Sequence, residues 1–136
     1  MQFHSTRSST AVSIDTALAA GLAPDGGLYV PERIPAVTLD SPGSTLAHTA
    51  QLLLAPYFAS SRLRDALPDI CNVAFNFPAP LRALAAPNDH LLELFHGPTA
   101  AFKDYAARFL AECLARLRDP GTPPTTILVA TSGDTG

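Results

Sequence analysis

Lys103 is the residue of this chain with the clearest capacity for covalent chemistry, because it is the only lysine. The other eight of the nine basic side chains are arginines. A primary amine condenses with an aldehyde to give a Schiff base, whereas a guanidinium stays protonated and does not. If the chain holds a carbonyl cofactor covalently, Lys103 is its only side-chain attachment point. The opposing interpretation is that Lys103 is an ordinary solvated charge near the start of a helix.

The end of the chain, residues 131–136, reads Thr-Ser-Gly-Asp-Thr-Gly and has the properties of an anion-binding turn. Its two glycines let a ligand approach the backbone closely, while Ser132 and Thr135 add hydroxyl donors. A following helix would add its positive N-terminus. The alternative interpretation is an ordinary strand-to-helix turn in which Ser132 or Asp134 caps the helix.

Three elements predicted from the pattern of apolar residues would bring the lysine and this turn together. Residues 91–95 form a short apolar strand, residues 103–118 an amphipathic helix, and residues 125–130 a second, parallel-type strand. Strand, helix and strand make a right-handed βαβ unit. Because ligands of open α/β sheets bind at the carboxyl ends of the strands, the lysine loop and the terminal turn should be neighbours.

The pattern also assigns the two faces of the predicted helix. Arg108, Glu112 and Arg116 occupy its wet face as ion pairs four residues apart. Asp104 either caps this helix or pairs with the lysine, and His96 either stacks on a cofactor or satisfies a backbone carbonyl. The predicted buried stripe consists of Phe102, Ala106, Phe109, Leu110, Cys113, Leu114 and Leu117.

The N-terminal part contains a helix and a turn whose ends are marked by typical capping and turn residues. Ser13 caps a helix over residues 14–20, and Gly21 follows that helix as its C-terminal cap. Pro-Asp-Gly-Gly at residues 24–27 predicts a tight turn, and residues 28–30 predict a short strand. The proline-rich stretch that follows should be irregular.

A second helix is expected to begin at Ser44 and to end or kink at Pro56. Residues 57–67 predict one or two further short helices. Residues 69–87, which contain three prolines, are interpreted as the passage between two domains. The apolar face of the second helix is predicted to consist of Leu46, Ala50, Leu53 and Leu54.

The predicted fold class is therefore α/β, in two domains. A small mixed α+β domain at residues 1–80 is followed by the start of a parallel-sheet domain, one βαβ unit, at residues 81–136. Hydrophobic residues make up 47% of the chain and charged residues 15%, which is a globular composition. Because the chain stops directly after an apolar strand, we expect it to be a fragment of a longer protein.

Composition and charge weigh against several classes of partner. The net charge is −3, with no basic run, which argues against nucleic acid or an anionic membrane. No apolar stretch is long enough to span a bilayer, and the N-terminus lacks the apolar segment of a secretory signal. Cys71 and Cys113 have no metal-binding spacing and are interpreted as reduced packing residues. We therefore expect a cytoplasmic protein without a metal site.

Three segments, in this order and spacing, carry a resemblance to a known family. Residues 5–7 (Ser-Thr-Arg) are followed at 21–31 by Gly-Leu-Ala-Pro-Asp-Gly-Gly-Leu-Tyr-Val-Pro. Residues 93–104 read Glu-Leu-Phe-His-Gly-Pro-Thr-Ala-Ala-Phe-Lys-Asp, and residues 130–136 read Ala-Thr-Ser-Gly-Asp-Thr-Gly. Together they resemble threonine synthase, a pyridoxal phosphate (PLP) enzyme of the tryptophan-synthase-β fold type. The Asp form of the last segment fits threonine synthases, whereas the wider fold type more often has Asn there.

The resemblance implies an activity in threonine and amino-acid biosynthesis, that of a carbon-oxygen lyase acting on phosphates. O-phosphohomoserine and water would give threonine and phosphate by γ-elimination and β-addition. Lys103 would bind the cofactor as a Schiff base and then move protons between the substrate carbons. Phe102 and Asp134 would lie against PLP, and Ser132, Gly133, Asp134 and Thr135 would bind the substrate.

The resemblance also implies that this chain alone is inactive. The family's PLP-phosphate loop and the partner of the pyridine nitrogen lie further downstream than Gly136, so the PLP-binding domain would be truncated after the terminal turn. The fragment could self-associate through an uncovered sheet edge. Two alternatives stay open: another PLP lyase of the same fold type, such as a threonine dehydratase or sulfhydrylase, and a catalytically silent threonine-synthase-like interaction domain.

Overall fold

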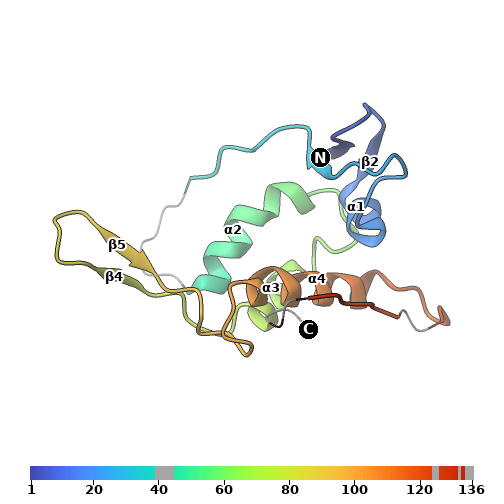
Figure 1. The fold of residues 1–136 in the computed structure, drawn as a ribbon. Coiled ribbons are helices and arrows are strands. Elements are labelled where there is room, and N and C mark those ends of the chain that lie inside the picture. The colour runs from blue at the N-terminus through green and yellow to red at the C-terminus, as the bar shows by residue number, and fades with distance from the viewer. Residues whose placement is uncertain (39–44, 124–125, 132, 134–136) are drawn as a thin grey trace.

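A computed structural model of the chain describes residues 1–38, 45–123, 126–131 and 133. The described residues form helices and two small antiparallel sheets, and the predicted mixed α/β class is confirmed (Figure 1). In chain order, the elements are β1 (Gln2–Ser5), β2 (Ala11–Ser13), α1 (Ile14–Ala20), β3 (Tyr29–Pro31), α2 (Leu46–Phe58), α3 (Leu67–Ala74), β4 (Leu81–Ala83), β5 (His90–Leu92) and α4 (Lys103–Leu117).

The N-terminal elements follow the sequence closely. β1 is the central strand of a three-stranded sheet and pairs antiparallel with both β2 and β3. The Ser13 side chain accepts a hydrogen bond from the Thr16 amide at 3.1 Å, which confirms the predicted start of α1. Gly21 ends the helix with φ 71°, a left-handed conformation that costs glycine little. The third strand begins at Tyr29, one residue later than predicted.

Helix α2 differs from the prediction at its end. It continues through Pro56 to Phe58, so of the two expectations for Pro56 the one that it ends the helix is wrong, and a kink there stays a prediction. Proline removes one intrahelical hydrogen bond. Phe58 lies only two residues further on and is 2% exposed in the core, and its burial compensates for that loss. Ser44, the predicted first residue, lies outside the described residues, and the Thr45 side chain caps the helix by accepting from the His48 amide.

The buried face of α2 is also rotated relative to the prediction. Leu53 was expected to be buried but is 42% exposed. Ala47 and Phe58 are buried instead, with Ala50 and Leu54 packed beside them. The aromatic Phe58 has the largest apolar surface on the helix, and its burial sets which side faces the core.

Helix α3 is the element that the sequence reading missed. Residues 57–67 were expected to hold short helices, but residues 59–66 form turns and the helix begins at Leu67. Pro68 lies in the first turn of this helix, where proline is well tolerated. Ile70, Cys71 and Ala74 of α3 are each 0% exposed, so this helix forms the centre of the core.

Helix α4 closes the core from the other side and packs against α3 and α1. Cys113 is fully buried, and the Phe109 ring stacks on Phe75 at 5.8 Å and meets the Phe58 ring edge-on at 5.9 Å. The predicted buried stripe is only half right. Phe102 and Leu110 are 62% and 40% exposed, and Ala106 between them is exposed as well.

The predicted βαβ unit is not formed among the described residues. β5 pairs antiparallel with β4 in a hairpin that projects from the helices (Figure 1), and residues 93–95 are not part of a strand. Residues 126–130 have no strand assignment. A short hairpin loop closes at less entropic cost than a crossover does, so β5 finds its partner locally.

Candidate active site

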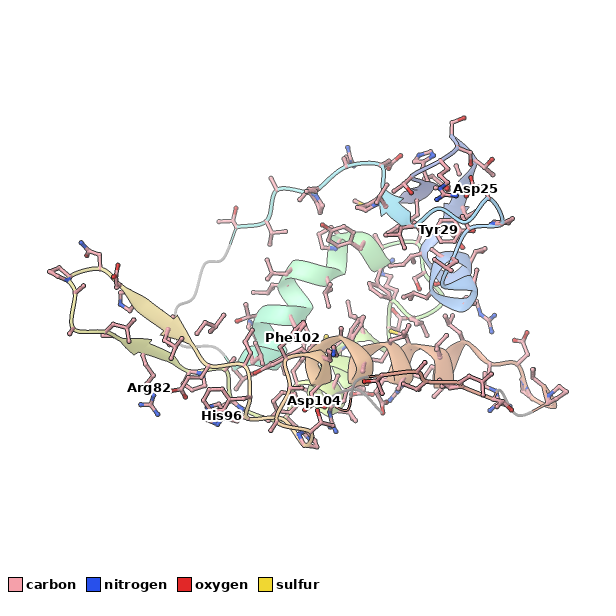
Figure 2. All side chains as sticks on the ribbon, viewed as in Figure 1. Asp25, Tyr29, Arg82, His96, Phe102 and Asp104 are labelled. Carbon is pink, nitrogen blue, oxygen red and sulfur yellow. The ribbon has the colours of Figure 1, made fainter. Side chains whose placement is uncertain are left out.

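Lys103 is the first residue of α4, and Phe102 is the residue just before the helix. The lysine is half-buried, and its Nζ atom lies 5.9 Å from the centre of the Phe102 ring. The exposed ring is labelled at the start of α4 in Figure 2. A rigid helix therefore carries the amine, and an accessible aromatic face lies beside it.

The loop before the lysine is held by Asp104. This side chain is only 6% exposed, and its Oδ2 atom accepts a hydrogen bond from the Thr99 amide at 2.9 Å. The prediction that Asp104 caps α4 is wrong, because no side chain caps this helix and the carboxylate bonds five residues upstream. The Ala100 amide donates to the Gly97 carbonyl at 3.0 Å, and Ala100 has φ 55°. Asp104 therefore folds the loop back onto the first turn of the helix.

Gly97 is required by the position of Asp104. A Cβ atom at Gly97 would lie 2.3 Å from Asp104 Oδ2, 2.7 Å from its Cβ and 2.8 Å from its Cγ. These distances are well inside van der Waals contact, so any side chain at this position would displace the carboxylate. The His-Gly-Pro-Thr stretch is thus built around the carboxylate of Asp104.

His96 lies in a small charged cluster at the entrance of the loop. Its Nε2 atom is 2.7 Å from Glu93 Oε2, and Arg82 Nε is 3.4 Å from Glu93 Oε1. The hydrogen bond with His96 and, to a smaller degree, the charge of Arg82 lower the pKa of Glu93. His96 also stacks on the Phe95 ring at 4.7 Å. Its partner is a carboxylate, and not the backbone carbonyl that was one of the two expectations.

Arg108 has a role that the sequence did not indicate. It was predicted to pair with Glu112 on the wet face, and only the Arg116–Glu112 pair is formed there. Arg108 instead donates to backbone carbonyls at the end of α3, and Tyr105, on the same side of α4, donates to the Pro78 carbonyl at 3.1 Å. Every residue has a backbone carbonyl, so residue types and spacing do not indicate which carbonyl Arg108 or Tyr105 will bind.

The first of the three recognised segments forms a separate polar cluster. Ser5 Oγ donates to Asp25 Oδ1 at 2.7 Å, and the Gly27 amide donates to the same oxygen at 2.9 Å. These two hydrogen bonds are the main causes of the lowered pKa of Asp25. A Cβ at Gly27 would lie 2.1 Å from Ser5 Oγ, so glycine is required there. Figure 2 shows Asp25 and Tyr29 at the N-terminal sheet, well away from His96 and Phe102.

The predicted substrate turn is largely outside the described residues. The structure does not describe Ser132, Asp134 or Thr135, so the predicted closeness of this turn to Lys103 stays a prediction. Gly133 is described, and its amide donates to Thr131 Oγ1 at 3.2 Å. Ile127 lines a surface hollow together with residues from the end of α4, and Figure 1 shows the segment running back along this helix.

The described residues offer little else that bears on chemistry. Within residues 1–38, 45–123, 126–131 and 133, no three His, Cys, Asp or Glu side chains could together hold a metal ion. Cys71 and Cys113 are unpaired thiols buried in the core, as predicted for packing residues. The longest helix of this part, α4, has 15 residues, and none of its helices could cross a membrane.

Comparison with known proteins gives a consistent result. A family described as the threonine synthase N terminus matches residues 2–75. A threonine synthase of Haemophilus influenzae is 42% identical over 130 aligned positions, which cover 92% of this chain and 29% of the relative. A threonine synthase of Pseudomonas aeruginosa is 41% identical over 147 aligned positions, which cover all of this chain and 31% of the relative.

Solved structures agree with the sequence relatives. A PLP-bound threonine synthase of Brucella melitensis superposes with a TM-score of 0.77 at 33% identity, over 86% of this chain and 27% of that one. A threonine synthase of Escherichia coli gives a TM-score of 0.77 at 30% identity, over 86% of this chain and 28% of that one. The chain thus spans less than a third of the proteins that it matches.

Proposed function

Because the chain belongs to the threonine synthase family, we propose that the protein containing it is a threonine synthase. It converts O-phosphohomoserine and water to threonine and phosphate with PLP as cofactor. The relatives of known name support this activity, and the PLP-bound Brucella structure supports the cofactor. The substrate follows from the resemblance of the three segments to this family.

The observation that carries the proposal is the way the lysine loop is built. The only amine side chain of the protein segment starts α4, and Asp104 and Gly97 fix the turn that leads to it. A covalently held cofactor needs its attachment point within narrow limits of position, and a helix start behind a tightly folded loop provides them. A half-buried amine beside an exposed aromatic ring also fits the flat ring of PLP.

Each predicted site residue then has a distinct part. Lys103 would hold the cofactor through its side-chain amine, and the same amine, when free, would move protons between the substrate carbons. Phe102 would pack near the cofactor, and Asp134 would help to hold it. Residues 132–135 bind the substrate carboxylate through hydroxyl and backbone donors. When bound, PLP supplies the electron sink for the elimination of phosphate.

The remaining features of the proposal concern the whole protein. The family match ends at residue 75, close to the proposed boundary between a domain at 1–80 and the PLP-binding domain that begins at 81. Groups that hold the PLP phosphate and the pyridine nitrogen belong to a part of the protein beyond these residues, so the 136-residue chain alone is inactive. We also propose a cytoplasmic location, and a tendency of the isolated chain to self-associate.

The test is reductive trapping of PLP on two proteins. The first is this chain, and the second is a chimera in which residues 1–136 replace the aligned N-terminal part of the Pseudomonas aeruginosa threonine synthase. Each is incubated with PLP, treated with borohydride and mapped by mass spectrometry. We expect an adduct at Lys103 in the chimera, and turnover of O-phosphohomoserine in preference to threonine.

The controls separate the proposal from its alternatives. Lys103→Ala in the chimera should abolish both adduct and turnover. An active chimera that prefers threonine would indicate another lyase of the same fold type. A folded chimera without an adduct would contradict the proposal and favour a catalytically silent relative. Threonine formation by the 136-residue chain itself would show that the claim of inactivity is wrong.

A further inference from the structure

We propose that Tyr105 and Arg108 form a clamp that fixes α4 on the segment 73–78 and thereby sets the direction in which Lys103 leaves the helix. The two residues act as positioning residues and do not touch the substrate. The inference rests on the proposed function, because it concerns the placement of the same lysine. It implies that segment 73–78, which precedes the lysine loop, is needed to position Lys103.

Arg108 makes the stronger half of the clamp. Its Nε atom donates to the Ala74 carbonyl at 3.1 Å, and Nη2 donates to the Val73 carbonyl at 2.8 Å and to Asn76 Oδ1 at 3.2 Å. The guanidinium also lies 5.6 Å from the centre of the Phe77 ring. These carbonyls belong to the last turn of α3, which has no further helical N–H groups to satisfy them. A cation at this end also complements the helix dipole.

Tyr105 makes the second half, one turn of helix earlier. Its hydroxyl donates to the Pro78 carbonyl at 3.1 Å, and its ring meets the Phe77 ring edge-on at 4.8 Å. Phe77 therefore contacts both the Tyr105 ring and the Arg108 guanidinium. The two side chains grip both the end of α3 and the chain that follows it.

The geometry of the helix connects this grip with the lysine. Residues advance by about 100° around an α-helix, so Tyr105 and Arg108 lie about 60° apart on one face. Lys103 lies about 160° from Tyr105, on the opposite side. A helix whose one face is bonded to a fixed segment cannot rotate about its axis without breaking those bonds. The clamp therefore fixes the side of α4 on which the amine emerges.

Arginine suits this position better than lysine would. Its planar fork reaches two successive carbonyls and a side-chain amide at once, whereas an ammonium is a single point charge. Arg108→Lys should therefore keep the charge near the α3 end but weaken the rotational restraint. Arg108→Met loses both, and Tyr105→Phe loses only the hydroxyl that reaches Pro78. These variants form a graded series on the same helix.

The first measurement tests the grip itself by amide hydrogen exchange in the 136-residue chain. The Phe75 amide closes the last turn of α3 by donating to the Cys71 carbonyl at 2.9 Å. In Arg108→Met we expect its exchange to be about tenfold faster or more, because a charged donor is removed from the carbonyls of that turn. Arg116→Met is the matched control, because Arg116 bonds only to Glu112 in its own helix. Equal exchange in both variants would overturn the clamp.

The second measurement uses the chimera and asks whether the clamp positions the lysine. All variants are assayed at a temperature at which circular dichroism shows them folded. We expect kcat to fall at least about tenfold in Arg108→Met and about threefold in Tyr105→Phe, with KM within about threefold of the parent. Arg108→Lys should fall between the parent and Arg108→Met. PLP occupancy of Lys103 at limiting cofactor, measured by borohydride trapping, should follow the same order.

The outcomes separate this inference from the proposed function. A parent chimera that is folded but has neither adduct nor turnover would overturn the proposed function, and the inference with it. A parent with adduct and turnover, but unchanged kcat and PLP occupancy in both Arg108→Met and Tyr105→Phe, would overturn the inference alone. If Arg108→Met does not fold, Tyr105→Phe decides, because it removes a single hydroxyl.

Discussion

Replacement of Gly97 by alanine is the sharpest test of how the lysine loop is built. The new methyl group would lie 2.3 Å from Asp104 Oδ2 and 2.7 Å from Asp104 Cβ. Both distances are shorter than any tolerated contact, so the Asp104 side chain and the start of α4 must move. The substitution thus acts on the first turn of the lysine helix, although it lies six positions before the lysine.

The cost follows from what must be broken. Moving the carboxylate gives up its hydrogen bond with the Thr99 amide, and a hydrogen bond to a charged group contributes about 1.5–3 kcal/mol. Overpacking of a well-filled site adds about 1–3 kcal/mol. The lower backbone entropy of alanine in the unfolded chain offsets about 0.4–1 kcal/mol of this loss. We therefore expect Gly97→Ala to lower the free energy of unfolding by about 3 kcal/mol.

The assay is urea unfolding of the 136-residue chain, followed by circular dichroism at the helical band. Gly121→Ala is the matched control, because nothing lies within 4 Å of a Cβ there and only its φ of 83° opposes the change. Gly121→Ala should lower the free energy of unfolding by about 1–2 kcal/mol. Asp104→Gly removes every atom that the Gly97 methyl group would meet most closely. The double variant should therefore be no less stable than Asp104→Gly alone.

Two results would refute this reasoning. If Gly97→Ala is no more destabilising than Gly121→Ala, the steric argument is wrong. If the costs of Gly97→Ala and Asp104→Gly simply add, the two positions are energetically independent, and Asp104 is not the reason for glycine. In the chimera, the same variant should reduce PLP occupancy of Lys103 at limiting cofactor.

Three further predictions concern parts of the chain away from the lysine. Burial raises the pKa of Cys113 to about 12, so iodoacetamide should leave this thiol unlabelled at neutral pH in the folded chain and label it in concentrated urea, by mass spectrometry. The hydrogen bond from Ser5 is the main cause of the lowered pKa of Asp25. The ionised Asp25 carboxylate therefore stabilises the fold at pH values above its ordinary pKa of 3.8, and this stabilisation is lost as the pH falls through the lowered pKa of the folded chain. Asp25→Asn should therefore flatten the acid side of a plot of urea midpoint against pH, and an unchanged slope would contradict this. Asp15→Ala should lower the free energy of unfolding by about 2 kcal/mol in urea titrations, because its carboxylate accepts hydrogen bonds from the 61–62 turn, and no change would show that these bonds are not stabilising.

The elements that the sequence predicted well are those whose signals are local. Ser13 and Gly21 mark both ends of α1 through bonds within four residues, and the bounds of α4 differ from the prediction by one residue. The expectation that Pro56 ends α2 was wrong, since a proline near a helix end costs little when packing favours the helix. Helix α3, which has Pro68 in its first turn, was missed. In these cases tertiary burial decided the outcome, and burial is not visible in one sequence.

The candidate site shows the same division. The sequence identified Lys103 by its chemistry, and no pattern within 93–104 indicated that Asp104 would turn back to the Thr99 amide. The rotation of α4 was mispredicted because Arg108 bonds to carbonyls of a helix that had itself been missed, and Tyr105 bonds to the Pro78 carbonyl in the chain that follows that helix. The predicted strand at 125–130 required hydrogen-bonding partners far away in the chain, and a single sequence does not specify them.

The core that α1 and α4 share has a consequence for how this polypeptide folds during translation. Ile14 in α1 and Cys113 in α4 belong to one buried cluster, although they lie near opposite ends of the chain. While the first three helices emerge during translation, the faces of α3 that Phe109 and Cys113 cover still meet water. The nascent N-terminal part therefore cannot complete its fold until α4 has left the exit tunnel. A pause in synthesis before that point would extend the time during which chaperones or neighbouring chains can bind the open core.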